Sequence, residues 1–381
     1  MFELDPFCTC PTCHAVSSFG VLNIGNNTLM RRCKACRYTE NETLPTLDKR
    51  VVYLDQFAIS NIYKVRSGEK LRPAHIHNLW VDFDQKITRA HMLQGVIFPP
   101  SDIHRDETIV SRFPSELRIA HEMFGGDTSF RRSGDLQMRQ QIAFAEAFEA
   151  GQSAPDLGFK VDEAITGKRN GWLSRLHITV NSDYSSFAGD LRRKRSQTHA
   201  ELSKLFESWK VERPGFKDIL KKELAAYGLT NRQMAADNLR NLIEAQLDEN
   251  FEKAYDIAHS NGMRELFIVR DFFKRKGYGE NDSLKKVFEF WAWPELEKIP
   301  FNWISAHLFA AIAARLAAGQ KTLPTQGLSN DVNAISTYLP YVDAMFLDNE
   351  CADILNDGRL KRGLSYTNPL KESPIPGYQS R

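Results

Sequence analysis

The sequence predicts an α/β protein in which a central parallel sheet is interrupted by a large all-helical segment and preceded by a small cysteine-rich unit. Three observations lead to this prediction. Short apolar strand patterns, such as VVYL at 51–54, run directly into helical patterns, as buried parallel strands do. Residues 116–300 consist mainly of long, charged stretches with helical periodicity. Five of the six cysteines lie within the first 36 residues.

Composition indicates a globular protein: of the 381 residues, 42% are hydrophobic and 26% are charged. No apolar run reaches the roughly 18 residues that a membrane span needs. The first ten residues, MFELDPFCTC, lack the basic and apolar regions of a signal peptide. We therefore expect a cytoplasmic protein that does not contact a membrane. The net charge of +2 argues against binding of nucleic acid by overall charge, so any basic surface must be local.

The cysteines of residues 1–45 form two CxxC pairs, CPTC and CKAC, separated by the 19 residues 14–32. This spacing is typical of a zinc ribbon, in which four thiolates hold a structural Zn²⁺ and the metal folds a segment too small to fold alone. Cys8 and His14 lie close enough to replace one ligand. The predicted ligands are Cys10, Cys13, Cys33 and Cys36.

A site closed by four thiolates has no open position for chemistry, so we expect this unit to hold nucleic acid or a partner protein. The contacting groups would be the basic residues around the second pair, Arg31, Arg32, Lys34 and Arg37.

Residues 48–115 are expected to form the first part of the sheet. The strand ending before Asp55 leads into a helix at about 56–66, and a second helix is expected at 75–93. A second buried strand follows in GVIF, where Pro99 and Pro100 end it and Ser101 is placed to cap a helix.

Residues 116–300 are predicted to be a helical insertion that shapes a channel or a homo-oligomer interface. Its densest basic run, RRKR at 192–195, could follow a phosphate backbone, with Phe206 and Trp209 stacking on bases. The alternative, which we prefer, is a solvated helix face with both aromatic rings in the core, because ELSKLFESW mixes charges of both signs.

Residues 301–381 complete the sheet and end in a polar tail. A core helix is expected up to Gly319, because apolar residues recur with a period near four between 304 and 316. A turn, a short helix and a strand, AMFLD, then lead to Asp348.

Four acids occupy comparable positions in this order of elements. Asp55 and Asp348 follow strands, Glu107 lies about one turn into the helix after the second strand, and Asp331 opens a late helix. Parallel strands end at one edge of a sheet, so these acids can converge. A cluster of carboxylates is commonly neutralised by divalent cations such as Mg²⁺ or Mn²⁺. Asp343 is a fifth candidate for this cluster, or caps its strand.

Each acid taken singly also has a structural interpretation. Asp55 and Asp331 could be helix caps, and Glu107 could be a solvated helix acid. His104, one turn before Glu107, could orient a carboxylate, although a histidine near a helix start is more often structural.

The ordered set YLDQFAIS, FPPSDIHRDE and SNDVNAISTYLPYVDAMFLDN resembles the PIN-like nuclease superfamily. The resemblance covers residues 48–115 and 300–360, and implies an α/β/α sandwich with a central parallel sheet. It also implies that the site residues are Asp55, Glu107, Asp331 and Asp348, holding Mg²⁺ or Mn²⁺.

The resemblance further implies a metal-dependent endoribonuclease that acts on RNA, with single-stranded DNA as the alternative substrate, in the setting of a bacterial toxin or an anti-phage defence effector. The competing hypothesis is a catalytically silent nucleic-acid-binding or protein-interaction module in which the zinc ribbon carries recognition.

Overall fold

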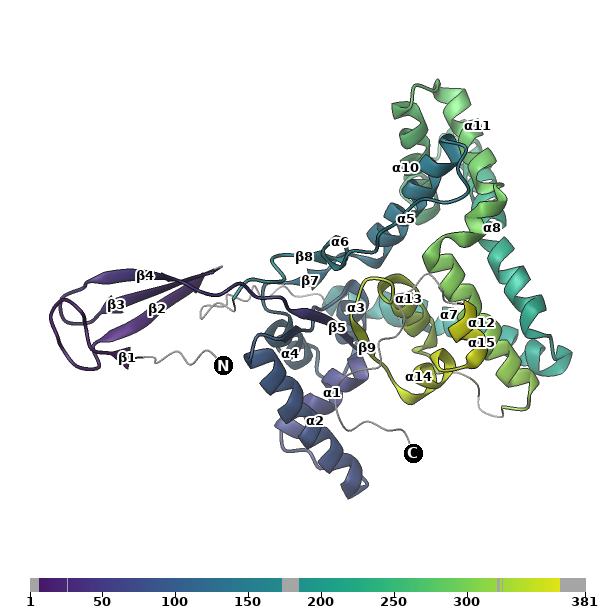
Figure 1. Cartoon of the computed structure of the whole chain (residues 1–381). Helices are drawn as coiled ribbons and strands as arrows, with labels where there is room; N and C mark the ends of the chain where they lie inside the picture. Colours follow the sequence, from purple (N-terminus) through teal and green to yellow (C-terminus); the bar gives the residue numbers. More distant parts are fainter. Residues whose placement is uncertain (1–6, 26, 173–184, 321–322, 324, 364–381) are drawn as a thin grey trace.

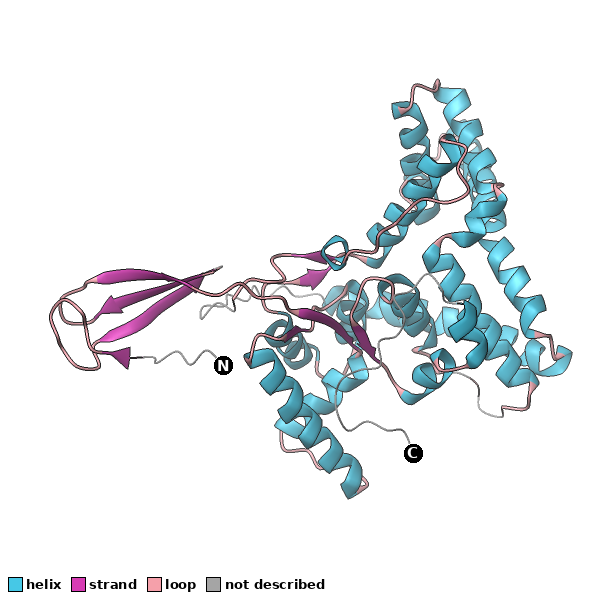
Figure 2. Ribbon diagram, viewed as in Figure 1, coloured by secondary structure: helices cyan, strands magenta, loops and turns pink. Residues whose placement is uncertain are grey.

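The computed structural model describes residues 7–25, 27–172, 185–320, 323 and 325–363 (Figure 1). It is a mixed α/β structure, as predicted, with an antiparallel sheet near the N-terminus, a parallel sheet farther along the chain and helices elsewhere (Figure 2).

The N-terminal unit is a four-stranded antiparallel sheet that projects away from the helices (Figure 1). Its strands follow one another in chain order, and a β-bulge falls between Val21 and Asn23. The strands are β1 (Phe7–Cys8), β2 (Phe19–Gly25), β3 (Thr28–Cys33) and β4 (Thr39–Thr43).

A short connector joins this unit to the rest of the chain. Leu44 is buried with Ile24 and Leu29, and Trp172 packs against the three. The Trp172 Nε1 also donates a hydrogen bond of 2.8 Å to the carbonyl of Pro45. The sheet is therefore fastened to a segment more than a hundred residues away in the sequence.

The parallel sheet has the order β6-β5-β9 and contains both strands that were expected to carry site acids. Strand β5 (Arg50–Leu54) pairs in parallel with β6 (Val96–Ile97) and with β9 (Ala344–Phe346). The prediction that the strands preceding Asp55 and Asp348 share one parallel sheet is confirmed. Strand β9 ends two residues earlier than expected, so Asp348 lies in the turn that follows it.

Alternating residues of β5 face two different hydrophobic clusters. Val51 and Tyr53 pack with residues of α3, α5 and α13, whereas Leu54 packs with residues of α1, α2 and α4. Helices therefore cover both faces of the sheet, which explains why β5 is apolar from Val51 to Leu54. These helices are α1 (Gln56–Arg66), α2 (Ala74–Met92), α3 (Asp102–Val110), α4 (Pro114–Gly125), α5 (Ser133–Glu149) and α13 (Leu328–Tyr338).

The predicted helices in the first part of the sheet agree with the structure to within one residue. Helix α1 has the expected bounds, α2 begins and ends one residue earlier, and the side chain of Ser101 caps α3 by accepting from the N–H of His104.

The segment 116–300 differs from the expectation in two respects. It is not entirely helical, because β7 (Ser129–Phe130) pairs with β8 (Ile165–Thr166). Its expected first residue, 116, falls inside α4 rather than between elements. The other elements are α6 (Val161–Ala164), α7 (Ser185–Glu212), α8 (Phe216–Leu247), α9 (Phe251–Ala258), α10 (Asn261–Arg275), α11 (Glu280–Trp291) and the 3₁₀ helix η1 (Pro294–Lys298).

Two long helices connect this segment to the rest of the chain. Helix α7 packs against α3 and α12 (Pro300–Ala317), and α8 packs against α12 before it reaches α10 and α11 in the upper arm (Figure 1). Phe206 and Trp209 of α7 are buried in the hydrophobic cluster that includes α12. This agrees with the preferred interpretation, in which both aromatic rings lie in the core. Two short C-terminal helices, α14 (Asn349–Leu355) and α15 (Gly358–Gly363), also pack on α12. No helix in the described part of the chain combines the length and the hydropathy of a bilayer span.

Candidate metal centre and acid site

The four cysteines of the CxxC pairs come together at one end of the N-terminal sheet. Their sulfur atoms all lie within 4.8 Å of one another, with Cys10 to Cys36 at 3.7 Å and Cys13 to Cys33 at 3.6 Å. Four thiolates at the usual Zn–S distance of about 2.3 Å from a tetrahedral ion are about 3.8 Å apart. A disulfide would bring two sulfurs to about 2 Å, and all four cysteines are free. The set could therefore hold a metal ion such as Zn²⁺.

Hydrogen bonds to sulfur favour the thiolate form of Cys33, one of the four cysteines. The Ser18 hydroxyl lies 3.3 Å from the Cys33 sulfur, and the N–H groups of Ala35 and Cys36 donate to the same atom at 3.3 and 3.5 Å. These contacts, with that of Ser18 the largest, lower the pKa of Cys33 to about 6. Neither Cys8 nor His14 belongs to the set, so the alternative ligands are not brought to the site.

The acid site lies at the carboxyl end of the parallel sheet. Asp55 directly follows β5, and its N–H donates to the carbonyl of Phe346 at 3.1 Å, so it lies beside the end of β9. Asp348 comes two residues after Phe346. Glu107 is contributed by α3, and Asp331 by the first turn of α13. Four acids from four elements thus approach one edge of the sheet.

Burial and mutual repulsion disfavour the charged forms of these acids. Burial first, then the charges of Glu107 and Asp348, raise the pKa of Asp55 from 3.8 to about 7. Burial, followed by the charges of Asp55, Glu107 and Asp348, raises the pKa of Asp331 to about 8. Burial also raises the pKa of Glu107. The side chains therefore act electrostatically as one cluster, and a cation would relieve the repulsion.

Helix capping does not account for Asp55 or Asp331. Asp55 occupies the N-cap position of α1, but its side chain makes no capping hydrogen bond. The neighbouring N–H groups of Gln56 and Phe57 only partly oppose the rise of its pKa. Asp331 is the fourth residue of α13, past the cap position at Gly327.

Asp348, in contrast, does cap a helix. One of its carboxylate oxygens accepts a hydrogen bond of 2.8 Å from the N–H of Cys351 at the start of α14. The structural role that was considered for an aspartate between a strand and a helix therefore applies to Asp348. The second oxygen remains available as a ligand, because a carboxylate offers two.

Glu107 has two partners that offset its charge. The Nδ2 of Asn330 donates to its Oε1 at 2.9 Å, and Nη2 of Arg195 lies 3.9 Å from the same oxygen. Arg195 belongs to the basic run of α7, and its Nε is buried without a hydrogen-bond partner. A cation from the helical segment therefore lies next to the acid site, a contact that the sequence analysis did not predict.

The candidate role of Asp343 as a fifth acid of the cluster does not agree with its position. Asp343 precedes β9, at the opposite end of the strand from Asp348, and its Oδ2 accepts a hydrogen bond of 2.8 Å from the N–H of Val51. Since its own N–H donates to the carbonyl of Val51 at 2.9 Å, it fastens β9 to β5. Asp343 therefore has the second of the two roles considered for it, that of capping its strand.

Two residues that the sequence analysis did not select lie at the site. The charge of Glu350 contributes to the raised pKa of Asp331. The sulfur of Cys351 and one oxygen each of Asp331 and Asp348 lie within 4.8 Å of one another. The sequence DNEC at 348–351 could have pointed to both residues, because the start of a helix that follows a strand of the site can supply more than one ligand.

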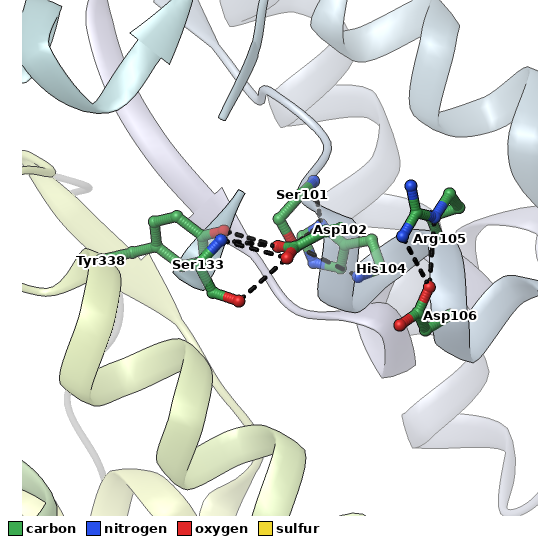
Figure 3. A network of polar contacts seen from close by, with 7 residues as sticks. All are labelled: Ser101, Asp102, His104, Arg105, Asp106, Ser133 and Tyr338. Atoms are coloured by element: carbon green, nitrogen blue, oxygen red, sulfur yellow. Dashed lines mark hydrogen bonds and ion pairs between the residues drawn. The ribbon is translucent and has the colours of Figure 1, made fainter. Parts of the chain in front are cut away.

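A polar network fixes the helices that carry Glu107 and Asp331 (Figure 3). Asp102, the first residue of α3, accepts hydrogen bonds from the N–H and hydroxyl of Ser133 and, at 2.9 Å, from the hydroxyl of Tyr338. These bonds connect the starts of α3 and α5 with the end of α13. His104 completes a capping box with Ser101, so its role is structural, as favoured.

Searches with protein-family models, against curated proteins and against solved structures found no match to this chain. The case for a function therefore rests on the chemistry and geometry of the residues themselves.

Proposed function

We propose that the chain is a metal-dependent nuclease of the PIN-like type, acting on phosphodiester bonds of RNA. The observation that supports this most directly is the group of electrostatically coupled acids at the carboxyl end of the sheet. Asp55, Glu107 and Asp331 are largely buried acids with raised pKa values, and in the described part of the chain none has an ion pair closer than the 3.9 Å contact of Glu107. Retaining such repulsion is costly unless a bound cation offsets it.

The oxygen ligands fit a hard divalent cation such as Mg²⁺ or Mn²⁺, which would activate a water molecule and stabilise the leaving oxygen of a phosphodiester. Asp55, Asp331 and Asp348 would be its ligands. Asn330 orients Glu107 through the 2.9 Å hydrogen bond. Arg195 is placed to contact a phosphate oxygen, because its guanidinium lies next to Glu107 and is not engaged at Nε.

The choice of RNA over single-stranded DNA comes from the PIN-like resemblance. The exposed basic residues of the N-terminal unit, Arg32, Lys34 and Arg37, would add contacts to the backbone of either polymer. The same basic surface favours the alternative, a nucleic-acid-binding module whose acid site is silent.

Substitution of Asp331 by asparagine tests the proposal. Because Asp331 is not a cap, Asp331→Asn should leave α13 folded, while cleavage of RNA in Mn²⁺ or Mg²⁺ should fall by orders of magnitude, since an amide is a poorer ligand for a hard cation. Asp343→Asn is the matched control, because its amide oxygen can still accept from Val51 and it lies at the other end of β9.

Cleavage would be followed on a panel of mixed-sequence RNA and single-stranded DNA. An Asp331→Asn variant as active as the parent would contradict the assigned site. A parent that binds RNA in an anisotropy assay but cleaves neither polymer would favour the silent module.

A further inference from the structure

A second candidate site lies at the opposite end of the parallel sheet from the acids. An open cavity of about 540 Å³ is lined by the residue before β5, the ends of α2 and α4, and the segments 126–128 and 167–172. Strand β5 is five residues long, or about 16 Å, and separates this cavity from Asp55. The cavity is thus distinct from the acid site and has the size of a small-molecule pocket.

A buried lysine lines this cavity. Lys49 is only 2% exposed, and its Nζ donates to the carbonyl of Gly171 at 2.5 Å. Within the described part of the chain it forms no ion pair. Burial lowers the pKa of Lys49 to about 8, although the charge of Asp127 partly opposes this. An ammonium group with one carbonyl partner is incompletely compensated, because it has three donors.

A buried histidine lines the same cavity. His91 is 5% exposed, and among the residues that the structure describes no hydrogen-bond partner of its Nδ1 is found. Burial, and to a lesser extent the charge of Lys49, lower the pKa of His91, while backbone contacts with Val96 and Met123 partly oppose this. A buried imidazole nitrogen without a partner carries a desolvation cost that a polar ligand would remove.

The walls of the cavity are held by two close backbone approaches. At Gly125 a Cβ atom would lie 2.5 Å from Cδ of Pro100, and at Gly167, where φ is +82°, it would lie 2.2 Å from the carbonyl oxygen of Asp127. Glycine is required at both positions, so the two segments that flank Lys49 are packed in place. The α4 side of the cavity presents Ile119 and Met123 beside Glu122, an acid that lies 3.8 Å from Arg118.

We propose that this cavity binds a small organic anion, with the anionic group on Lys49 and His91 and an apolar or aromatic body against the wall formed by α4. Either a carboxylate or a phosphomonoester would supply the anionic group. The two candidate ligands are therefore an aryl carboxylic acid and a nucleoside monophosphate. The proposal does not depend on the function of the acid site.

The test combines a charge-removing variant with two probes. Lys49→Met keeps the length of the side chain and removes its charge, so the ligand-free variant should melt at a higher temperature than the parent. Lys86→Met, at an exposed lysine that pairs with Asp82, is the control and should not change the melting temperature measurably.

Adenosine monophosphate and 3-phenylpropionate would then be titrated into parent and variants by calorimetry. We expect one of them to bind the parent, with an affinity at least about tenfold lower in Lys49→Met, since a hydrogen bond to a charged group contributes that much. His91→Gln should weaken the same probe. Which probe binds identifies the source of the anion.

Three results would overturn the proposal: neither probe binds the parent, binding is the same in Lys49→Met, or the ligand-free variant melts below the parent. If Lys49→Met does not fold, binding of the probes to the parent still tests the proposal. A second measurement is then the acylation of Lys49 in the parent, followed by mass spectrometry. A saturating probe should slow that acylation, and an unchanged rate would count against the site.

Discussion

Replacing Asp55 with asparagine should stabilise the metal-free protein above neutral pH. Asp55 is 7% exposed, and its pKa is raised from 3.8 to about 7, chiefly by burial and then by Glu107 and Asp348. Such a difference corresponds to at most about 4 kcal/mol of unfolding free energy that the charged carboxylate removes from the folded state. If Asp55 were a helix cap, the same change would be nearly neutral, because asparagine caps as well as aspartate.

The pH dependence has a defined direction. A folded-state pKa above the unfolded value means that the carboxylic acid favours folding; its contribution is complete below pH 3.8 and is lost as the pH rises through about 7. The parent should therefore lose stability between pH 4 and 7 relative to Asp55→Asn. The difference should be near zero at pH 4 and largest at pH 8.

Urea denaturation of both proteins at pH 4, 6 and 8, in buffers passed over a chelating resin, would measure this difference. Soluble chelators are avoided because they would also remove a metal from the cysteine site. Added Mn²⁺ should then stabilise the parent more than the variant, while Asp343→Asn should respond to Mn²⁺ as the parent does. A stability difference that does not change with pH, or an Asp55→Asn protein that is less stable at pH 8 without metal, would refute the reasoning.

Two further predictions concern other parts of the chain. Purified protein should contain one zinc per chain by elemental analysis, and Cys33→Ser with Cys36→Ser should remove it and unfold the N-terminal sheet alone, as seen by proteolysis; zinc retained by this variant would contradict the assigned ligands. Gly228→Ala should lower the free energy of unfolding, measured in urea, by about 1–3 kcal/mol or more, because its Cβ would lie 2.3 Å from the carbonyl oxygen of Trp291. Gly189→Ala, with open space around it, is the control and should be neutral or stabilising. Equal effects would mean that α8 does not pack this closely.

Local patterns were sufficient for the elements around the acid site. The apolar run before Asp55 predicted β5, and the periodicity after it predicted α1 with its observed bounds. The spacing of the CxxC pairs predicted the cysteine cluster because short turns fix the positions of their ligands. These features depend on neighbours within a few residues.

Features that depend on strand direction or on distant contacts were less accessible. The sequence left open whether Asp343 joins the acids or caps its strand; it precedes β9 and Asp348 follows it, so the two lie at opposite ends of the strand. Glu350 was missed although a helix was expected after Asp348, because nothing in the local pattern shows that an acid in its first turn lies near Asp331. The approach of Arg195 to Glu107 joins residues 88 positions apart, and no local pattern encodes it.

The helical segment is part of the scaffold of the acid site. Helix α7 packs against α3 and supplies Arg195, and Ser133 at the start of α5 donates to Asp102 at the start of the same helix. The helix that carries Glu107 is thus contacted by residues of the segment at its first residue and at Glu107 itself. Arg195 also offsets part of the charge that burial makes unfavourable. Because the segment both positions Glu107 and partly neutralises its charge, the repulsion among the four acids is lower in the intact chain than the acids alone would produce. The cation that the site would bind needs to balance only the remaining negative charge.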